Sequence, residues 1–144
     1  MPKQSFLILF VLLLGGLLLA GCAGSGQSAG KVKLADVAAL PEQVRRAPAA
    51  VRTAYQFAAA NPDALANVPC YCGCGAIGHK SNLACYVKEF SADGRPVFDS
   101  HALGCSICVD IALDVMKMTN EGRSPAEIRQ QIVDTYSKFG PANQ

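Results

Sequence analysis

The chain has 144 residues and a formal net charge of +2, from 13 basic and 11 acidic side chains. This near balance, together with the lack of a basic run interleaved with aromatic residues, excludes the charge pattern of a nucleic-acid-binding domain. The unusual feature of the composition is seven cysteines in so short a chain.

The N-terminal segment has the pattern of an export signal. Lys3 precedes an apolar run, residues 6–19, that is too short to span a bilayer comfortably and ends in small residues. The letters "LAGC" (residues 19–22) resemble the lipobox of bacterial lipoproteins, which implies cleavage before Cys22 and acylation of its thiol. We therefore expect a signal peptide over residues 1–21 and a protein of the bacterial cell envelope, extracytoplasmic and lipid-anchored to the membrane through Cys22. An uncleaved membrane helix is the alternative.

The rest of the chain is long enough for one small domain, because removal of the first 21 of the 144 residues leaves 123. Residues 23–30, "AGSGQSAG", carry too little apolar surface to fold, which predicts a flexible tether. We expect the lipidated cysteine and the tether to occupy residues 22–46, and a Cys-rich helical domain to occupy residues 47–141.

Helical patterns precede the cysteines. Residues 48–60 predict an amphipathic helix ended by Asn61-Pro62, with apolar positions at helical spacing: Val51, Ala54, Tyr55 and Ala58. One further helical turn fits in "PDALANVP", after which Pro69 and two glycines exclude a regular helix, so the first thiols are expected on a loop. Residues 82–98 can form a short helix, or a strand with a turn at Asp93-Gly94; we expect the helix.

The last third of the chain predicts a helical hairpin. Its first helix has one apolar stripe: Cys108, Ile111, Ala112, Val115 and Met118. After Gly122, Ser124 is the expected N-cap of the second helix, Pro125 takes the first helical position, and Glu127 completes a capping box. The apolar face of the second helix is Ile128, Ile132 or Val133, and Tyr136, and Gly140-Pro141 ends it. The fold class expected is mostly α, a small helical bundle with a Cys/Gly-rich metal-binding loop and a C-terminal helical hairpin.

Apart from Cys22, the cysteines and both histidines form two groups along the chain: first Cys70, Cys72, Cys74, His79 and Cys85, and then His101, Cys105 and Cys108. Thiolate sulfur binds Cu(I) and Zn(II) well, and neutral imidazole serves both ions. We therefore expect a binding module, not an enzyme, whose cofactor is Cu(I) before Zn(II). The core ligands expected are Cys70, Cys72, Cys74 and Cys85. A metal-delivery partner is implied.

The spacing of the thiols indicates that their sulfur atoms can converge on one metal ion. In a C-x-C segment two sulfurs lie on the same side of an extended backbone, and glycines let that backbone turn tightly. Cys105 and Cys108 are one helical turn apart at the start of a helix, where the helix dipole favours thiolate. Met116 has a thioether suited to Cu(I), but a helical methionine is more often a core residue.

Two other interpretations remain open. An exported protein with six remaining cysteines can hold three disulfides that staple a small fold. Alternatively, Cys105 and Cys108 can act as the redox pair of a thiol-disulfide oxidoreductase. A hydrolase with one activated thiol is not expected, because six thiols with no oxyanion-hole motif fit that mechanism poorly.

Two family resemblances follow from these residues. The stretches "VPCYCGCGAIGHKSNLACYV" and "DSHALGCSICVDIALDV" resemble the PCYCGC-motif lipoproteins of bacteria, over about residues 47–140, which implies a lipid-anchored extracytoplasmic domain with a metal-related role. Residues 104–141 also resemble the C-x-x-C helical hairpin of CcmH-type thiol reductants in cytochrome c maturation, whose redox pair maps onto Cys105 and Cys108. This chain has Leu103-Gly104 where that motif has Leu-Arg, and it adds the C-x-C-x-C cluster, which counts against a pure reductase.

Overall fold

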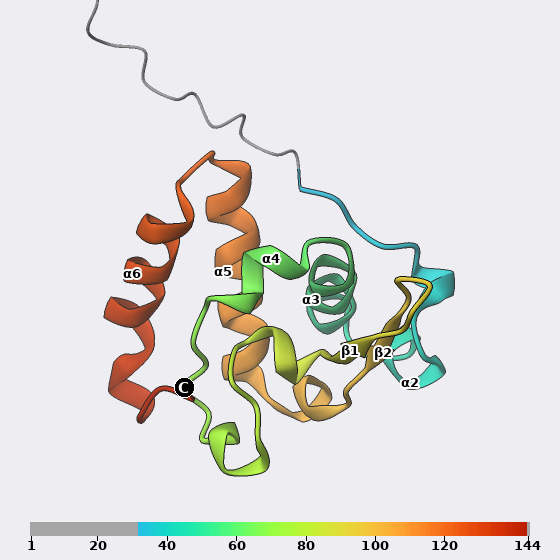
Figure 1. Cartoon of the computed structure of the whole chain (residues 1–144), viewed down its shortest axis with the longest axis horizontal. Coiled ribbons are helices and arrows are strands. Elements are labelled where there is room, and N and C mark those ends of the chain that lie inside the picture. Colours follow the sequence, from blue (N-terminus) through green and yellow to red (C-terminus); the bar gives the residue numbers. More distant parts are fainter. Residues whose placement is uncertain (1–31, 144) are drawn as a thin grey trace, which may run out of the picture.

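The computed structural model describes residues 32–143. The expected signal peptide, Cys22 and the glycine-rich tether segment 23–30 lie outside these residues. The described part of the chain is mostly helical and carries a two-stranded antiparallel sheet (Figure 1), which confirms the expected fold class. Within residues 32–143, no helix is both long and apolar enough to cross a membrane.

Three helices form the centre of the fold. Helix α3 (Ala49–Ala60) packs against α5 (Ser106–Asn120), which packs in turn against α6 (Pro125–Tyr136). The apolar face of α3 is buried through Tyr55 and Phe57, and the whole predicted stripe of α5 is buried, as expected. The short helix α4 (Pro62–Ala66), the further turn predicted after α3, leads into the cysteine-rich loop.

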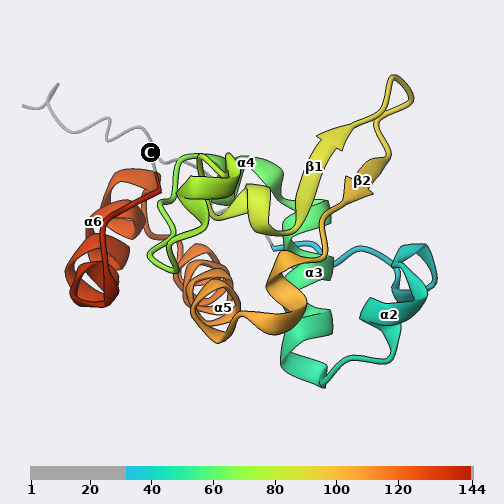
Figure 2. The same ribbon diagram turned by 90° about the horizontal axis from the view of Figure 1, so that it is seen from below.

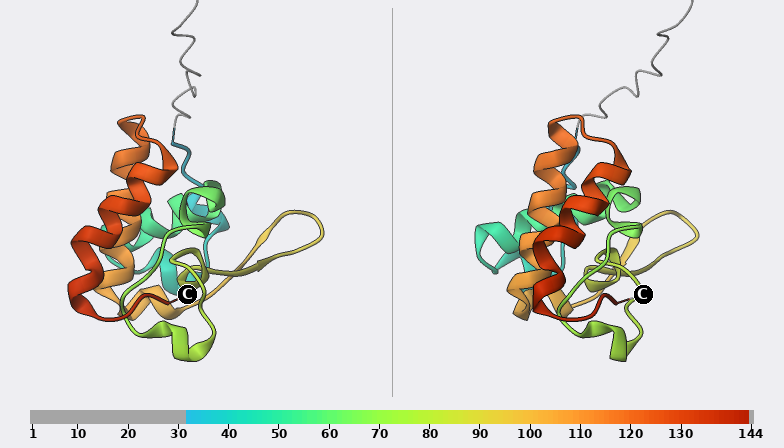
Figure 3. Two further views of the ribbon diagram at one scale, coloured as in Figure 1. Left: turned by 60° about the vertical axis from the view of Figure 1, so that its left-hand side comes forward. Right: turned by 90° about the vertical axis from the view of Figure 1, so that its left-hand side faces the viewer.

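The C-terminal helical hairpin is confirmed in detail. Helices α5 and α6 lie side by side and run in opposite directions (Figures 1 and 3). Ser124 is the N-cap of α6, Pro125 is its first residue, and the side chains and backbones of Ser124 and Glu127 form both halves of the capping box. Of the two alternative core positions, Ile132 is buried and Val133 is half-buried.

Residues 82–98 do not form the helix that we expected; the alternative, strands joined by a turn at Asp93-Gly94, is correct. A 3-10 turn, Leu83–Cys85, is followed by strands β1 (Val87–Phe90) and β2 (Pro96–Phe98), which project from the helical body as a hairpin (Figure 2). Turn chemistry decides the outcome: the Asp93 carboxylate accepts hydrogen bonds from Ser91 and Arg95, and Gly94 takes a φ of +79° that other residues avoid.

The folded domain begins upstream of the boundary expected at residue 47. Before residue 47 the chain already forms the 3-10 turn Val37–Ala39 and helix α2 (Glu42–Arg45). Two side chains of this stretch, Leu40 and Val44, are buried in the core. Residues 32–46 thus include core positions, because two apolar side chains in this stretch pack against the domain. At the other end the packed chain reaches Asn143, whose backbone N–H donates to the carbonyl of Cys70 at 3.0 Å.

Candidate metal centre

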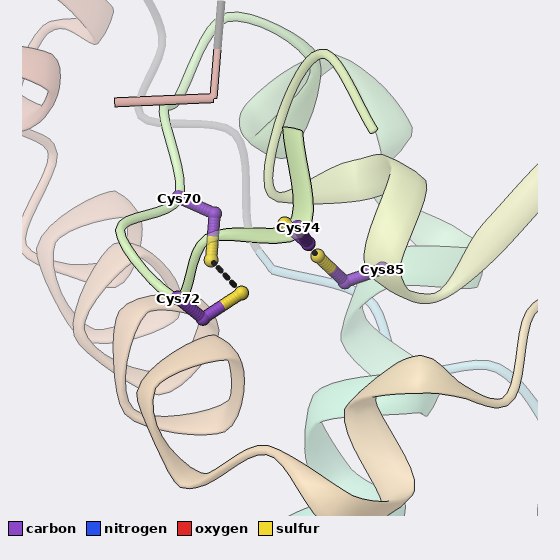
Figure 4. A group of neighbouring side chains, drawn as sticks. All are labelled: Cys70, Cys72, Cys74 and Cys85. Carbon is purple, nitrogen blue, oxygen red and sulfur yellow. Dashed lines mark hydrogen bonds between the residues drawn. The ribbon is translucent and has the colours of Figure 1, made fainter. Parts of the chain in front are cut away.

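Three separate segments bring the cysteines to one place: the loop after α4, the 3-10 turn Leu83–Cys85, and the start of α5. Figure 4 shows the thiols of the first two segments, where Cys70 and Cys72 point at each other and Cys74 points at Cys85. A tight reversal lets the loop present all three of its thiols, since Gly73 between Cys72 and Cys74 has a φ of +80°.

The loop is joined to α5 through Cys108. The sulfurs of Cys70, Cys72 and Cys108 form a triangle whose three sides are each 3.5 Å. Cys105, the N-cap of α5, places its sulfur 3.1 Å from that of Cys108. Sulfurs that share one tetrahedral ion at bonds of about 2.3 Å are about 3.8 Å apart. The triangle is therefore close to the spacing that one shared ion requires.

Cys74 and Cys85 make a second pair, with their sulfurs 3.6 Å apart. Both histidines lie next to these thiols. The ring centroids of His79 and His101 are 5.1 Å apart, and Nε2 of His101 is 3.5 Å from the sulfur of Cys72. His101 thus lies between the pair and the triangle.

The structure brings all eight sequence-predicted donors into one cluster. Their donor atoms form overlapping groups of four, within each of which every pair of atoms is no more than 4.8 Å apart: Cys70, Cys72, Cys74 and Cys85; Cys72, His101, Cys105 and Cys108; and Cys74, His79, Cys85 and His101. Three or more cysteine and histidine donors at such distances can hold a soft or borderline metal ion. The two groups read along the sequence therefore make a single centre.

All six described cysteines are free thiols, so the structure contains none of the disulfides of the stapled-fold interpretation. Met116 is half-buried and packs against the hydrophobic core, as expected for a helical methionine. Most of the thiols are buried, whereas Cys72 and Cys105 are half-buried. Solvent therefore reaches the cluster on the side of these two residues.

The crowding of thiols changes their acidity. The Cys108 thiol interacts with Cys70, which holds the pKa of Cys70 well below the usual thiol range and raises the pKa of Cys108. Burial raises the pKa of Cys72. Neighbouring thiols in the cluster therefore resist ionising together, and a bound cation would offset the repulsion between their thiolates.

Three residues that sequence reasoning missed hold the cluster in place. Asn143 accepts a hydrogen bond from the Cys70 backbone N–H and donates its side-chain amide to the Cys74 sulfur at 3.3 Å. Tyr86 Oη and Asn82 Nδ2 donate to the carbonyl of Cys108 at 2.7 and 3.2 Å. Asn82 and Tyr86 lie within the motif region, next to Cys85, but Asn143 stands alone near the end of the chain with no pattern to mark it.

The sequence model of the family described as "Protein of unknown function with PCYCGC motif" matches residues 11–143, and the chain belongs to this family. The motif itself is residues 69–74, the segment that supplies three of the clustered thiols. No curated protein and no solved structure matches the chain.

Proposed function

We propose that this member of the PCYCGC family is an exported, lipid-anchored protein that binds a thiophilic transition metal ion, Cu(I) in preference to Zn(II). The observation that carries the proposal is the meeting of six thiols and two imidazoles in groups whose donor atoms lie within 4.8 Å of one another. The lipobox-like residues 19–22 support the anchoring part of the proposal, in which Cys22 would be the acylated residue.

The donor set supports the choice of ion. Thiolate is a soft ligand that selects Cu(I) and Zn(II) over Mg(II) and Ca(II), which require oxygen ligands. Sulfur outnumbers nitrogen by six to two among the donors, which favours the softer ion, Cu(I). A partner protein that delivers or receives the ion would reach it on the side of Cys72 and Cys105, the half-buried thiols.

The test is a metal titration of the reduced chain under anaerobic conditions. Cu(I), supplied from a chelator of known affinity, should transfer to the protein, and Mg(II) and Ca(II) should not bind. Native mass spectrometry of the same samples gives the number of ions bound. A reduced, folded chain that takes up neither Cu(I) nor Zn(II) would remove metal binding from consideration.

A thiol-disulfide oxidoreductase is a second candidate, favoured by the 3.1 Å distance between the sulfurs of Cys105 and Cys108. In that reaction the two thiols would form one disulfide and release two electrons and two protons, which reduce a substrate disulfide to two thiols. The double variant Cys105→Ser/Cys108→Ser separates the candidates. A redox pair predicts lost disulfide exchange with unchanged metal content, whereas the metal centre predicts reduced metal affinity.

A further inference from the structure

The eight donors divide into two sets of four, of which the second is a group whose donor atoms all lie within 4.8 Å of one another. One set, here called the thiolate set, consists of the triangle and its neighbour: Cys70, Cys72, Cys108 and Cys105. The other, here called the mixed set, contains two thiols and both imidazoles: Cys74, His79, Cys85 and His101. Four ligands fill a tetrahedral coordination sphere, so eight donors are enough for two ions.

The strongest observation for the mixed set concerns His79. Its Nδ1 atom is buried and has no hydrogen-bond partner in the described structure. A buried polar atom without a partner destabilises the folded state, and such atoms are rare enough to require an explanation. A donor atom of His79 lies within 4.8 Å of those of Cys74, Cys85 and His101, so a metal ion bound to these residues through Nδ1 would supply the missing partner.

The carboxylate of Asp99 faces the imidazole of His79. Its Oδ2 atom lies 3.8 Å from Nε2 of His79, and its Oδ1 atom accepts a hydrogen bond from the backbone N–H of His101 at 2.7 Å. The separation between Oδ2 and Nε2 is longer than a hydrogen bond, so the carboxylate acts electrostatically: it favours the tautomer that carries the proton on Nε2 and leaves a free lone pair on the other ring nitrogen. For His79 that other nitrogen is the buried Nδ1.

The two sets differ in chemistry. Four thiolates make the softest donor combination in the protein and suit Cu(I). Two thiolates with two neutral imidazoles carry two negative charges and match the Cys₂His₂ set that holds Zn(II) in structural sites. The sets adjoin at the 3.5 Å contact between Cys72 and His101.

We propose that the cluster is a two-ion centre, in which the thiolate set holds Cu(I) and the mixed set holds Zn(II). This inference rests on the proposed function and extends it from one ion to two different ions. The Zn(II) would lock the loop of Cys74 and His79 to the turn of Cys85, while the Cu(I) lies nearer the half-buried Cys105, where exchange with a partner is easier.

The test loads the reduced full chain anaerobically with Cu(I) and Zn(II) together and counts both metals by native mass spectrometry and elemental analysis. The wild type should hold both metals at once. His79→Gln should lose the Zn(II) and keep the Cu(I), while Lys80→Gln, the exposed neighbouring residue, should behave as the wild type. Circular dichroism checks that each variant is folded.

A second variant, Cys105→Ser, changes the thiolate set and leaves the mixed set intact, so the test does not depend on His79→Gln alone. It should weaken Cu(I) binding and leave Zn(II) in place. Co(II) substituted for Zn(II) should show visible bands of a two-sulfur, two-nitrogen site in the wild type, and these bands should be absent in His79→Gln.

The outcomes separate the two proposals. Cu(I) that fills the whole cluster and displaces Zn(II), or a His79→Gln variant that keeps both metals, overturns the two-ion centre while metal binding stands. A chain that binds neither metal overturns both.

Discussion

Replacement of Cys70 by serine removes one sulfur from the middle of the cluster with little change in shape. Cys70 is fully buried, and its sulfur lies 3.5 Å from those of Cys72 and Cys108. Without metal, the new hydroxyl lies among weak hydrogen-bonding groups, which costs about 1–2 kcal/mol of unfolding free energy. With metal, the loss is larger, because oxygen is a poor ligand for Cu(I).

The linkage between binding and folding sets the size of the effect. A free ion concentration of about a thousand times Kd stabilises the native state by about 4 kcal/mol. For a domain of this size that corresponds to a rise in Tm of roughly 15 °C. Wild-type protein should show this rise when Cu(I) is added under reducing conditions, and Cys70→Ser should lose most of it. The measurement is differential scanning calorimetry with and without buffered Cu(I).

Met118 provides the matched control. It is a buried sulfur-containing residue of α5 outside the cluster, and Met118→Leu should cost less than about 1.5 kcal/mol. This variant should keep the full metal-dependent rise in Tm. An unchanged rise in Cys70→Ser would refute the role given to its thiol, and a lost rise in Met118→Leu would show that general destabilisation is responsible.

Other substitutions test the surroundings of the centre. Asn143→Ala should lower the unfolding free energy of the metal-free protein by about 1–3 kcal/mol in urea, because it leaves the buried Cys70 N–H without its acceptor; an unchanged midpoint would mean that the tail does not hold the loop. Asp99→Asn should weaken Zn(II) binding about 10- to 100-fold in competition titrations, since it removes the carboxylate beside His79, and unaltered affinity would exclude that electrostatic role. Ser124→Ala should cost about 1 kcal/mol in thermal unfolding without affecting metal binding. The Ser124 hydroxyl lowers the pKa of Glu127, so the stabilisation is present above the ordinary glutamate pKa and is lost as the pH falls through the lowered value; the difference between wild type and variant should therefore narrow in acid. Cys22→Ala should release the chain from membranes in fractionation with its metal content unchanged, and continued membrane retention would contradict the lipid anchor.

Local signals were sufficient for the helices. The capping box at Ser124 and Glu127 and the buried stripe of α5 are read directly from residue spacing, because each depends on contacts within one turn or one face. The β-hairpin was the alternative that the sequence left in second place, because its strands are only four and three residues long. Apolar runs of that length fit a helix or a strand equally well, and the turn at Asp93 and Gly94 decides between them.

The identity of the donors could be predicted, but their arrangement could not. Residue type alone marked the thiols and imidazoles as soft ligands. Sequence spacing gave no reason to pair Cys70 with Cys108, which is 38 residues away, rather than with the nearer Cys85. That pairing depends on how α5 docks against the loop, and the docking uses hydrogen bonds from Asn82 and Tyr86 to a backbone carbonyl, which every residue possesses.

The docking of α5 explains why a small helical fold can support so many thiols in one place. The carbonyl of Cys108 accepts two side-chain hydrogen bonds from the segment that also carries Cys85, so the first turn of α5 and this segment are fixed to each other without metal. The cysteine-rich loop is held differently, through Asn143 and a few backbone contacts, and its tip residues 76–78 are exposed. A rigid half that presents Cys85, Cys105 and Cys108 therefore faces a half with fewer restraints. An ion that bridges the two halves gains its binding energy from the metal–ligand bonds and has to order only the loop, so the entropic cost of binding is confined to that segment.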